Sequence, residues 1–361
     1  MKVAIVYDRV NKWGGAERVL LALHKLFPNA PLYTSVHNNT SAPWSKVFTV
    51  IPSFLQNFPF AKNSHELYPL LMPIAFESFS FDKYDLVISV TSESAKGIIT
   101  KPHTKHICYL LTPTRYLWSG YKNYFKNEYV RFLSYPLIWY LRTWDIIASK
   151  RPDAYIAISK EVQKRIKKYY NEESLLLYPP VYSNLAKMKN KIKGVESQKP
   201  YFLIVSRLVD YKRIDIAIEA CNELALPLKI VGIGSSEQAL RNIAGSTIEF
   251  LGSLTDDELI RYYKGCKALL FPGHEDFGLT VIEAHLFGKP VIAYKKGGAL
   301  ETINEGKTGE FFYPQTKSAL IDTIRYFMSK TYDAQSCKKQ ASLFNEKKFN
   351  SELLRIIGEF I

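Results

Sequence analysis

Apolar and polar positions in the second half of the chain alternate in short blocks that predict strands and helices in turn. Apolar runs of five or six residues lie at 201–206, 228–232, 247–252, 268–273 and 290–294. Amphipathic stretches lie between them at 213–224, 235–244, 256–266 and 278–288. Strands that alternate with helices predict a parallel sheet covered on both faces, in which ligands bind beyond the carboxyl ends of the strands.

The first half of the chain shows similar blocks at wider spacing. Apolar runs that predict strands lie at 3–6, 84–90, 106–111 and 153–159. Amphipathic spacing predicts helices within 11–27 and at 160–170. The stretch 178–200 opens with paired prolines and becomes polar and lysine-rich, which predicts a linker. A length of 361 residues is compatible with two α/β domains on either side of it.

Composition narrows the classes of partner and the compartment. The net charge of +14 indicates an anionic partner, such as nucleic acid, an anionic membrane surface or a phosphorylated small molecule. No zinc, RNA-recognition or helix-turn-helix signature is present, so we expect no nucleic-acid partner. The four cysteines show no metal-ligand spacing and are expected to be reduced thiols in a cytoplasmic protein. The longest apolar run, 132–148, is interrupted by Arg142 and Asp145 and is not expected to span a bilayer.

Two carboxylates flank a short apolar segment near the end of the second half. Glu275 and Glu283 are separated by seven residues, which include Phe277, Gly278 and Leu279. Two helical side chains eight positions apart point about 80° away from each other, so Glu275 is predicted on the loop before the helix and Glu283 inside it. The backbone N–H groups of Gly278 and Leu279, at the helix N-terminus, suit a phosphate.

Carboxylates repel phosphate but accept hydrogen bonds from hydroxyl groups. A nucleotide sugar offers ribose hydroxyls, a diphosphate and sugar hydroxyls in that order, and one carboxylate on each side of the anion site would fit it. The alternative is that Glu275 is a solvated loop residue and Glu283 an ordinary helix residue.

Two other segments have the character of anion sites. In "VSRLVDYKR", Arg207 and Lys212 follow a predicted strand and could clamp a diphosphate, or could belong to a solvated charge run. In "WGGAER", Gly14 and Gly15 precede a helix and allow the backbone to approach a ligand, although the full dinucleotide fingerprint is absent. The segment "GGALE" at 297–301 repeats this pattern, and a simple turn explains it equally well.

Taken together, these segments resemble the family 4 retaining glycosyltransferases. The motifs "SRLVDYK" and "EDFGLTVIEA", followed by "GKPVIA", match that family's basic and paired-glutamate signatures, and "GGAERVLLAL" is similar to its N-terminal glycine loop. The segments "TPTRYLW" and "GGALETINEGKTGEFF" resemble the O-antigen-type mannosyltransferases of the group. The resemblance implies the GT-B fold, in which two Rossmann-like domains face each other across a cleft.

The resemblance also implies domain limits and site residues. Residues 1–180 would form the acceptor-side domain, 181–344 the nucleotide-sugar domain, and 345–361 a helix that packs back on the first. The catalytic residues would be Arg207 and Lys212, on the donor diphosphate, and Glu275, on the donor sugar. Glu283 would accept hydrogen bonds from the ribose. Further donor-binding residues would be Phe277, Gly278 and Leu279, with Gly14 and Gly15 on the other domain and Gly232 and Gly252 lining the base pocket.

The implied reaction is transfer of a hexose to a glycan or lipid-linked acceptor in cell-surface polysaccharide synthesis, with retention of configuration. The expected donor is GDP-mannose, and a UDP-sugar donor is the alternative. An epimerase or hydrolase of nucleotide sugars on the same fold, a dinucleotide oxidoreductase and a non-catalytic basic binding protein are the rival classes. The chain has no Asp-x-Asp motif, so no metal is expected, and no cofactor other than the donor itself.

One position departs from the family pattern. The family usually has a histidine directly before Thr-Pro, and this chain has Leu111 there. Because leucine cannot bind a sugar hydroxyl, Thr112 or Arg115 is expected to supply that contact.

A set of basic and aromatic residues predicts attachment to the inner face of the cell membrane, with a packed helix pair as the alternative. The cations are Lys122, Lys126, Arg131 and Arg142, and the aromatic residues are Tyr121, Tyr124, Phe125, Phe132, Trp139, Tyr140 and Trp144.

Overall fold

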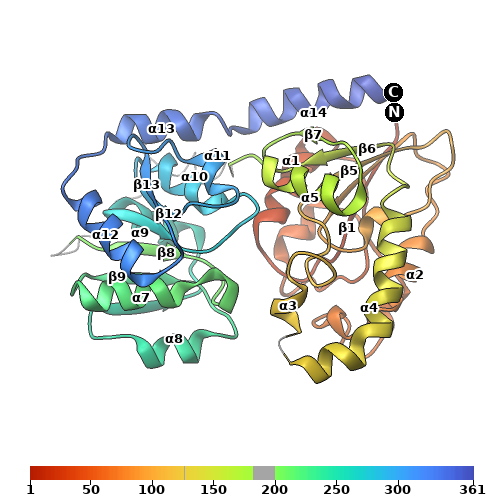
Figure 1. Cartoon of the computed structure of the whole chain (residues 1–361). Helices are drawn as coiled ribbons and strands as arrows, with labels where there is room; N and C mark the ends of the chain where they lie inside the picture. Colours follow the sequence, from red (N-terminus) through yellow and green to blue (C-terminus); the bar gives the residue numbers. More distant parts are fainter. Residues whose placement is uncertain (126, 182–199) are drawn as a thin grey trace. The chain divides into compact units, whose positions relative to one another are not determined.

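The chain forms two compact units. The computed structural model describes residues 1–125, 127–181 and 200–361. Unit 1 comprises Met1–Pro179 and Phe349–Ile361, and unit 2 comprises Pro180–Lys348 (Figure 1). The sequence analysis places the domain boundaries after residues 180 and 344, and the units of the structure change after Pro179 and Lys348. Of the linker predicted at 178–200, residues 182–199 lie outside the described residues.

Unit 1 is built on a parallel sheet of seven strands in the order β3-β2-β1-β4-β5-β6-β7. The strands are β1 (Val3–Tyr7), β2 (Leu32–Thr34), β3 (Val50–Pro52), β4 (Leu86–Thr91), β5 (Lys105–Leu110), β6 (Ala154–Ala157) and β7 (Leu175–Leu176). Every residue of β1 and β4 is buried. That burial explains why the central strands appear in the sequence as continuous apolar runs.

The helices of unit 1 include those predicted at 11–27 and 160–170. They are α1 (Gly15–Leu26), α2 (Leu71–Glu77), α3 (Tyr121–Tyr124), α4 (Glu128–Ala148), α5 (Lys160–Tyr170) and most of α14 (Glu346–Phe360). Short 3-10 turns lie at Pro43–Val47, Phe54–Asn57, His65–Leu67 and Ala95–Gly97. Side chains fix two helix starts, since Asn127 caps α4 and Ser159 caps α5 by accepting backbone N–H bonds.

Unit 2 has a second parallel sheet, of six strands, in the order β10-β9-β8-β11-β12-β13. The strands are β8 (Phe202–Val205), β9 (Leu228–Val231), β10 (Ile248–Gly252), β11 (Ala268–Phe271), β12 (Val291–Tyr294) and β13 (Gly309–Phe312). The helices are α7 (Ile214–Glu223), α8 (Glu237–Ile243), α9 (Asp256–Gly265), α10 (Leu279–Leu286), α11 (Ala299–Thr302), α12 (Lys317–Met328) and α13 (Ala334–Ser342), with a 3-10 turn at Asp210–Lys212.

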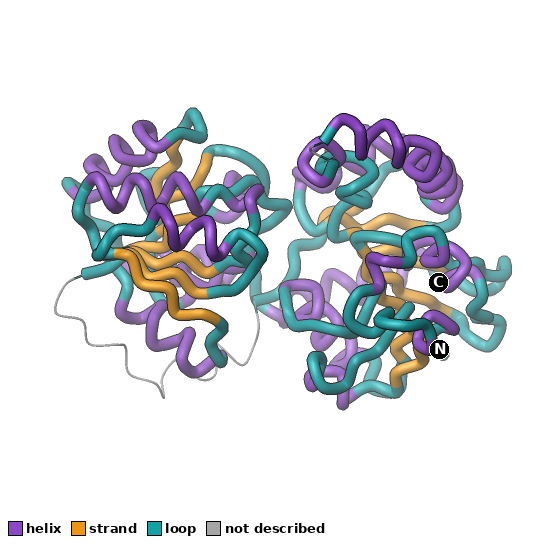
Figure 2. Tube along the Cα trace, turned by 90° about the horizontal axis from the view of Figure 1, so that it is seen from below, coloured by secondary structure: helices purple, strands orange, loops and turns teal. Residues whose placement is uncertain are grey.

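Each face of the second sheet has its own apolar core. Phe202 and Ile204 of β8 belong to the core under α7 and α12, and Leu203 belongs to the core under α9 and α10. Figure 2 shows the strands of each unit as a layer between helices. The predicted alternation of strands and helices is confirmed. One detail differs: α10, expected at 278–288, begins at Leu279 because Gly278 adopts a left-handed conformation with φ of 87° and serves as the N-cap.

The last helix joins the two units through the chain. Helix α14 begins at Glu346, and its residues from Phe349 onward belong to unit 1. The Phe349 ring packs edge-on against Tyr109 of β5, with 6.0 Å between the ring centroids. Leu353, Ile356 and Ile357 of the same helix are also buried.

Candidate functional site

Each sheet has a topological switch point at which ligands of open α/β sheets commonly bind. In unit 2 the chain runs from β8 outward to β9 and β10 and then returns to β11 on the other side of β8. In unit 1 it runs from β1 to β2 and β3 and then returns to β4. The crevices beyond the carboxyl ends of β8 and β11, and of β1 and β4, are therefore the places to examine.

Lys212 and Glu275 meet at the switch point of unit 2. Lys212 ends the 3-10 turn that follows β8, and Glu275 lies on the loop that follows β11. Their side chains form an ion pair, and only 11% of the lysine and 16% of the glutamate side chain is exposed. The structure thus brings together two of the three residues predicted to be catalytic. A pair shielded from water to this degree interacts more strongly than one on an open surface.

Backbone contacts join the loops around this pair. A Cβ atom at Gly273 would lie 3.0 Å from the Lys212 Cα atom, so any larger residue there would press on the turn after β8 and shift it. The Gly298 N–H donates to the Glu275 backbone oxygen at 2.9 Å. The segment 297–301, which the sequence left open between a ligand loop and a simple turn, therefore helps to position Glu275.

The two glycines predicted in the base pocket are neighbours on the other side of the switch point. The Gly232 N–H donates to the Gly252 oxygen at 2.8 Å, and a Cβ atom at Gly232 would collide with the Ser206 oxygen. The Leu208 N–H donates to the Ile233 oxygen at 3.0 Å. The loops after β10, β9, β8, β11 and β12 therefore form one continuous edge.

Arg207 has a different contact from Lys212. It lies on the exposed surface after β8, and its Nη2 donates to the Tyr211 hydroxyl at 2.7 Å. Of the two cations predicted to clamp the diphosphate, Lys212 is therefore held in an ion pair, and Arg207 is exposed at the same strand end. The joint action of the two cations on a ligand stays a prediction.

Glu283 lies deeper in unit 2 than the sequence suggested. Its side chain is on α10, the residue is 1% exposed, and its Oε2 accepts a hydrogen bond of 2.8 Å from the Tyr263 hydroxyl of α9. Phe277 is also buried, and its ring packs against Phe344. Phe277 is therefore suited to reach a ligand through its backbone rather than through its ring, and the predicted ribose contact of Glu283 stays a prediction.

The residues predicted on unit 1 lie at the ends of β1 and β5. Gly14 caps α1 and Gly15 is its first residue, without a side-chain cap. Thr112, two residues after the end of β5 at Leu110, is buried, and its Oγ1 accepts a hydrogen bond of 3.2 Å from Arg165. Arg115 is half-buried. Between the two candidates for the missing sugar contact, Arg115 is the more accessible.

The segment 112–118 is anchored by a buried carboxylate that the sequence reasoning did not select. Asp145 of α4 accepts hydrogen bonds from Thr114 Oγ1 at 3.1 Å and from Trp118 Nε1 at 2.7 Å. It also pairs with the buried Lys96 at 2.5 Å. An acidic residue within the apolar run 132–148 was the available signal, and it was used only as evidence against a membrane span.

Arg9 and Glu93 form a second ion pair, at the switch point of unit 1. Arg9 follows β1, Glu93 follows β4, and their side chains meet at 2.6 Å with 12% and 20% exposed. His65 Nε2 lies 3.3 Å from the other oxygen of Glu93. Burial alone would raise the pKa of the Glu93 carboxyl, but Arg9 and His65 outweigh burial and lower that pKa to about 2. The sequence reasoning missed this pair because 84 positions separate its members.

Three further observations concern metal ligands, thiols and membrane-spanning helices among the described residues. Within those residues, no three His, Cys, Asp or Glu side chains gather as metal ligands. All four cysteines are free and buried. In the same part of the chain, none of the helices is long and apolar enough to cross a bilayer.

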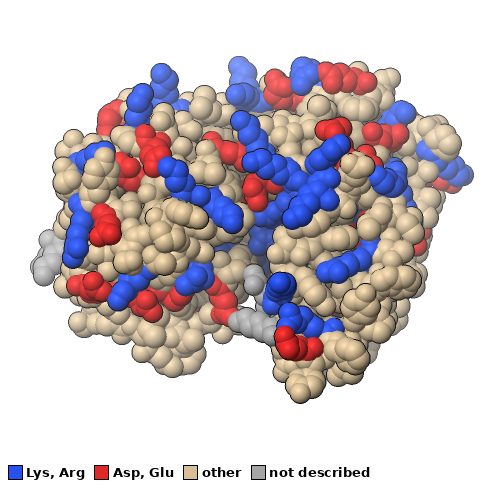
Figure 3. Space-filling view, in the orientation of Figure 1, with Lys and Arg blue, Asp and Glu red and all other residues tan. Residues whose placement is uncertain are grey.

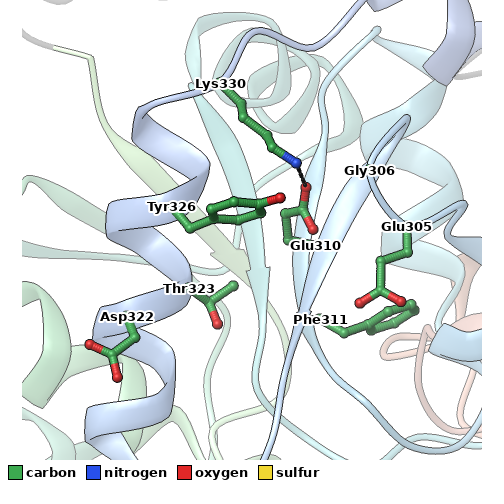
Figure 4. Close-up of a pocket in the computed structure, with 8 residues that line it drawn as sticks. All are labelled: Glu305, Gly306, Glu310, Phe311, Asp322, Thr323, Tyr326 and Lys330. Atoms are coloured by element: carbon green, nitrogen blue, oxygen red, sulfur yellow. Dashed lines mark ion pairs between the residues drawn. The ribbon is translucent and has the colours of Figure 1, made fainter.

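A surface hollow of about 480 Å³ lies between β13 and α12 of unit 2 (Figure 4). The residues that line it are Glu305, Gly306, Glu310, Phe311, Asp322, Thr323, Tyr326 and Lys330. Glu310 pairs with Lys330 at 3.5 Å and accepts a hydrogen bond from Tyr332 at 2.6 Å. No residue predicted to bind the donor lines this hollow, so it is separate from the candidate site.

Comparison with known proteins identifies the second unit. Residues 186–344 match the family model of glycosyl transferases group 1. The chain carries a glycosyl transferases group 1 domain. The Lys212–Glu275 pair and all the residues predicted on the nucleotide-sugar side lie within this group 1 domain.

Curated relatives match parts of the chain. It is 31% identical over 132 residues to O-antigen chain mannosyltransferase C of Escherichia coli, which covers 34% of this chain and 36% of that protein. It is 28% identical over 149 residues to D-rhamnosyltransferase WbpZ of Pseudomonas aeruginosa, with 39% of each covered. A glycogen synthase of the same bacterium is 32% identical over 165 residues, which cover 41% of this chain and 32% of that enzyme. The matches thus span less than half of each relative.

Solved structures match the whole chain in fold. Anabaena HepE in complex with UDP-glucose superposes with a TM-score of 0.71 at 18% identity, covering 99% of this chain and 100% of that one. Sucrose-phosphate synthase from Thermosynechococcus elongatus gives a TM-score of 0.72 at 16% identity, with 100% and 99% covered. The predicted fold class, two parallel-sheet Rossmann-like domains of the GT-B type, is confirmed. The predicted cleft between the domains stays a prediction.

Proposed function

We propose that the protein is a retaining glycosyltransferase that moves a hexose from a nucleotide sugar to a glycan or lipid-linked acceptor in cell-surface polysaccharide synthesis. The observation that carries this proposal is the Lys212–Glu275 ion pair, which lies at the switch point of a group 1 domain. A cation beside a carboxylate suits a ligand that presents phosphate oxygens next to sugar hydroxyls, as a nucleotide sugar does.

The chemical step requires stabilisation of a nucleoside diphosphate as it leaves. Lys212 and Arg207, which follow β8, would neutralise the negative charge that develops on the diphosphate. Glu275 would accept hydrogen bonds from the donor sugar and hold its reacting carbon against the acceptor. The leaving phosphate would help to take the proton of the acceptor hydroxyl, without a metal and in a site closed against water.

The acceptor would bind on unit 1, beside Arg9 and Glu93. A guanidinium donates and a carboxylate accepts hydrogen bonds, so the pair can hold adjacent hydroxyl groups of a sugar from both sides. The low pKa of Glu93 keeps its carboxylate ionised at neutral pH, so it acts there as an acceptor. A lipid-linked acceptor would bring the enzyme to the inner face of the cell membrane from the cytoplasm.

For the donor we propose GDP-mannose, with a UDP-sugar as the second candidate. The name of the Escherichia coli relative favours mannose, and the UDP-glucose complex of Anabaena HepE favours the alternative. A thermal-shift panel of GDP, GDP-mannose, UDP and UDP-glucose tests both, because a ligand that binds the folded state raises the unfolding temperature.

The nucleotide sugar that raises the unfolding temperature should then be consumed only when an acceptor is added. Equal release of nucleotide with and without an acceptor would indicate a hydrolase instead. Isomerisation of the donor sugar would indicate an epimerase. Binding of none of the four compounds would contradict the proposed function.

A further inference from the structure

The outer face of α4 is apolar along the whole helix. Tyr129, Phe132 and Leu133 are 82%, 80% and 78% exposed. The exposed apolar residues of α4 are Tyr129, Val130, Phe132, Leu133, Tyr135, Trp139, Tyr140, Ile146 and Ile147. A helix on the surface of a globular protein normally turns charged and polar residues outward, so this face is arranged for something other than water.

Helical spacing places these side chains in two columns. Phe132, Trp139 and Ile146 recur every seven residues, as do Leu133, Tyr140 and Ile147. Seven residues make about two helical turns, so each column runs along one side of the helix. The residues that α4 buries against unit 1 lie on the opposite side and are Ile138, Leu141, Asp145 and Ala148. None of residues 128–137 is buried, so the first half of α4 packs less closely on unit 1 than the second half, although Leu137 of this part joins an apolar cluster.

The basic and aromatic set predicted to meet a membrane divides into two parts. Arg142 faces the protein, because its Nε donates to the Leu117 oxygen at 2.8 Å and its guanidinium lies over the Tyr121 ring. Trp144 also faces inward and donates to Glu77 at 2.7 Å. Phe132, Trp139 and Tyr140 face outward. Lys126 lies outside the described residues.

Charge distinguishes between two occupants of this face, an anionic bilayer and a second copy of the chain. Residues 115–170 contain twelve Lys and Arg against four Asp and Glu. Figure 3 shows Lys and Arg side chains gathered over α5 and mainly uncharged residues over the lower part of α4. Half of this excess belongs to α5, since α4 itself has two cations and two anions. An anionic bilayer that meets this side of unit 1 would attract the excess, whereas a second copy would add to it.

The composition of the face points the same way. A pairing seam between two helices favours aliphatic residues at its core positions, but Pro136 and Thr143 lie between the two columns of α4. Tyrosine and tryptophan, which α4 exposes at Tyr129, Tyr135, Trp139 and Tyr140, have rings that sit well at the level of lipid headgroups.

We propose that α4 lies in the plane of an anionic membrane, with its outer face in the boundary between headgroups and acyl chains. The helix would not cross the bilayer, because its inner face is committed to unit 1. The inference deepens the proposed function by placing the enzyme where lipid-linked acceptors are. It rests on the surface of unit 1, and its test needs no catalysis, so the two proposals can fail separately.

Flotation with vesicles tests the proposal. The vesicles contain either phosphatidylcholine and phosphatidylglycerol in equal parts or phosphatidylcholine alone. The unaltered chain should bind the anionic vesicles more tightly, and added salt should weaken that binding. The double variant Phe132→Ser/Leu133→Ser should bind anionic vesicles about tenfold less tightly or worse, because two apolar anchors are lost. Its unfolding temperature should not fall, because both residues are exposed.

A matched control removes exposed apolar groups outside α4. Leu67 and Tyr313 are 63% and 70% exposed, and Leu67→Ser/Tyr313→Ser should bind vesicles like the unaltered chain. Three results would overturn the proposal: absence of binding to anionic vesicles, equal binding by the α4 variant, or equal loss in the control. A dimer in light scattering that Phe132→Ser/Leu133→Ser dissociates would assign the face to a second copy instead.

A label at Tyr135 gives an independent readout. The four native cysteines are buried, and a polarity-sensitive thiol dye should therefore label Tyr135→Cys selectively. Anionic vesicles should shift its emission to the blue, and should leave the same dye on Tyr313→Cys unchanged. Equal behaviour of the two labels would contradict insertion by α4.

Discussion

Lys212 and Glu275 form an ion pair across the switch point between β8 and β11. Each residue was selected from a different motif, and the fold places them together because both follow strands that are neighbours in the sheet. The pair holds a cation and a carboxylate at fixed positions with little access to water. Removal of one partner leaves the other charge without its counter-charge, so single and double substitutions there must be compared.

Loss of either cation should slow the transfer reaction. Arg207→Ala and Lys212→Ala should each lower turnover by about a hundredfold, the scale for removal of a group that stabilises charge in a transition state. Arg213→Ala is the matched control, because that neighbouring cation pairs with Asp215 at 3.0 Å. Steady-state kinetics with one defined donor decide the matter. Near-normal turnover in a folded Arg207→Ala/Lys212→Ala protein would rule out the diphosphate clamp.

The two glutamates should differ in what they affect. Glu275→Gln should mainly slow transfer, because its proposed partner is the reacting sugar, and Glu283→Gln should mainly weaken binding of GDP. Tyr263→Phe removes the hydroxyl that Glu283 holds but keeps the carboxylate, so it should retain most of the GDP affinity. Calorimetry with free GDP measures all three. Equal losses in the two glutamate variants would contradict the assignment, and a loss in Tyr263→Phe as large as in Glu283→Gln would point to a packing role.

Substitution of the Arg9–Glu93 pair should affect the acceptor and spare the donor. Arg9→Gln and Glu93→Gln should raise the KM for the acceptor about tenfold or more, since a hydrogen bond to a charged group contributes about 1.5–3 kcal/mol. The nucleotide affinity should stay unchanged. Asp82→Asn, which removes an exposed ion pair of unit 1 with Lys101, serves as the control. An unchanged acceptor KM in both variants would exclude an acceptor site there.

Arg115 should replace the sugar contact that Leu111 cannot make. Arg115→Ala should slow transfer more than it weakens GDP binding, and Leu111→His should be tolerated or only mildly harmful. Leu111 is half-buried at the end of β5, where its N–H donates to the Thr91 oxygen at 2.8 Å, so the backbone at this position is held whatever the side chain. Kinetics of both variants with one donor give the answer. Wild-type behaviour of Arg115→Ala would point to a donor sugar with an apolar edge, such as a deoxyhexose.

Stability should fall in mild acid because of buried histidines. Burial, with a smaller contribution from the charge of Arg151, lowers the pKa of His106 from 6.5 to about 3. Below pH 6.5 the unfolded chain gains a proton that the folded chain does not accept until about pH 3, so stability declines across that window. Between pH 7 and pH 5, the free energy of unfolding measured in urea should fall by about 1–2 kcal/mol less for His106→Gln than for the unaltered chain. The exposed His103→Gln should not differ, and an equal acid response in all three proteins would contradict the argument.

The sequence predicted those parts of the fold that have a strong repeating pattern. Strands β8 to β12 were predictable because buried apolar runs alternate with amphipathic helices. Strands β2 and β3 have three residues each, too few to show a period, and β13 begins with Gly309 and Glu310, which do not resemble a buried run. Strands β3 and β13 lie at sheet edges and β2 lies next to one, and all three depend on pairing with neighbours that only the folded sheet supplies.

The same limit applies to the candidate site. The sequence predicted Lys212 and Glu275 after strands but did not predict their contact, which agrees with the general rule that residues after adjacent parallel strands gather at one edge. The contacts of Arg9 with Glu93 and of Glu283 with Tyr263 depend on strand order and on helix packing, which no local pattern encodes. The role of Gly273 was missed for a related reason, because it reflects how closely two loops approach each other.

The course of α14 has a consequence for the order of folding. Unit 1 combines Met1–Pro179 with Phe349–Ile361, whereas unit 2 is the single stretch Pro180–Lys348 between them. The ring contact between Tyr109 and Phe349 therefore joins residues 240 positions apart. Closing so long a loop costs more chain entropy than forming the contacts within unit 2, so we expect unit 2 to fold first and the docking of α14 to complete unit 1 afterwards.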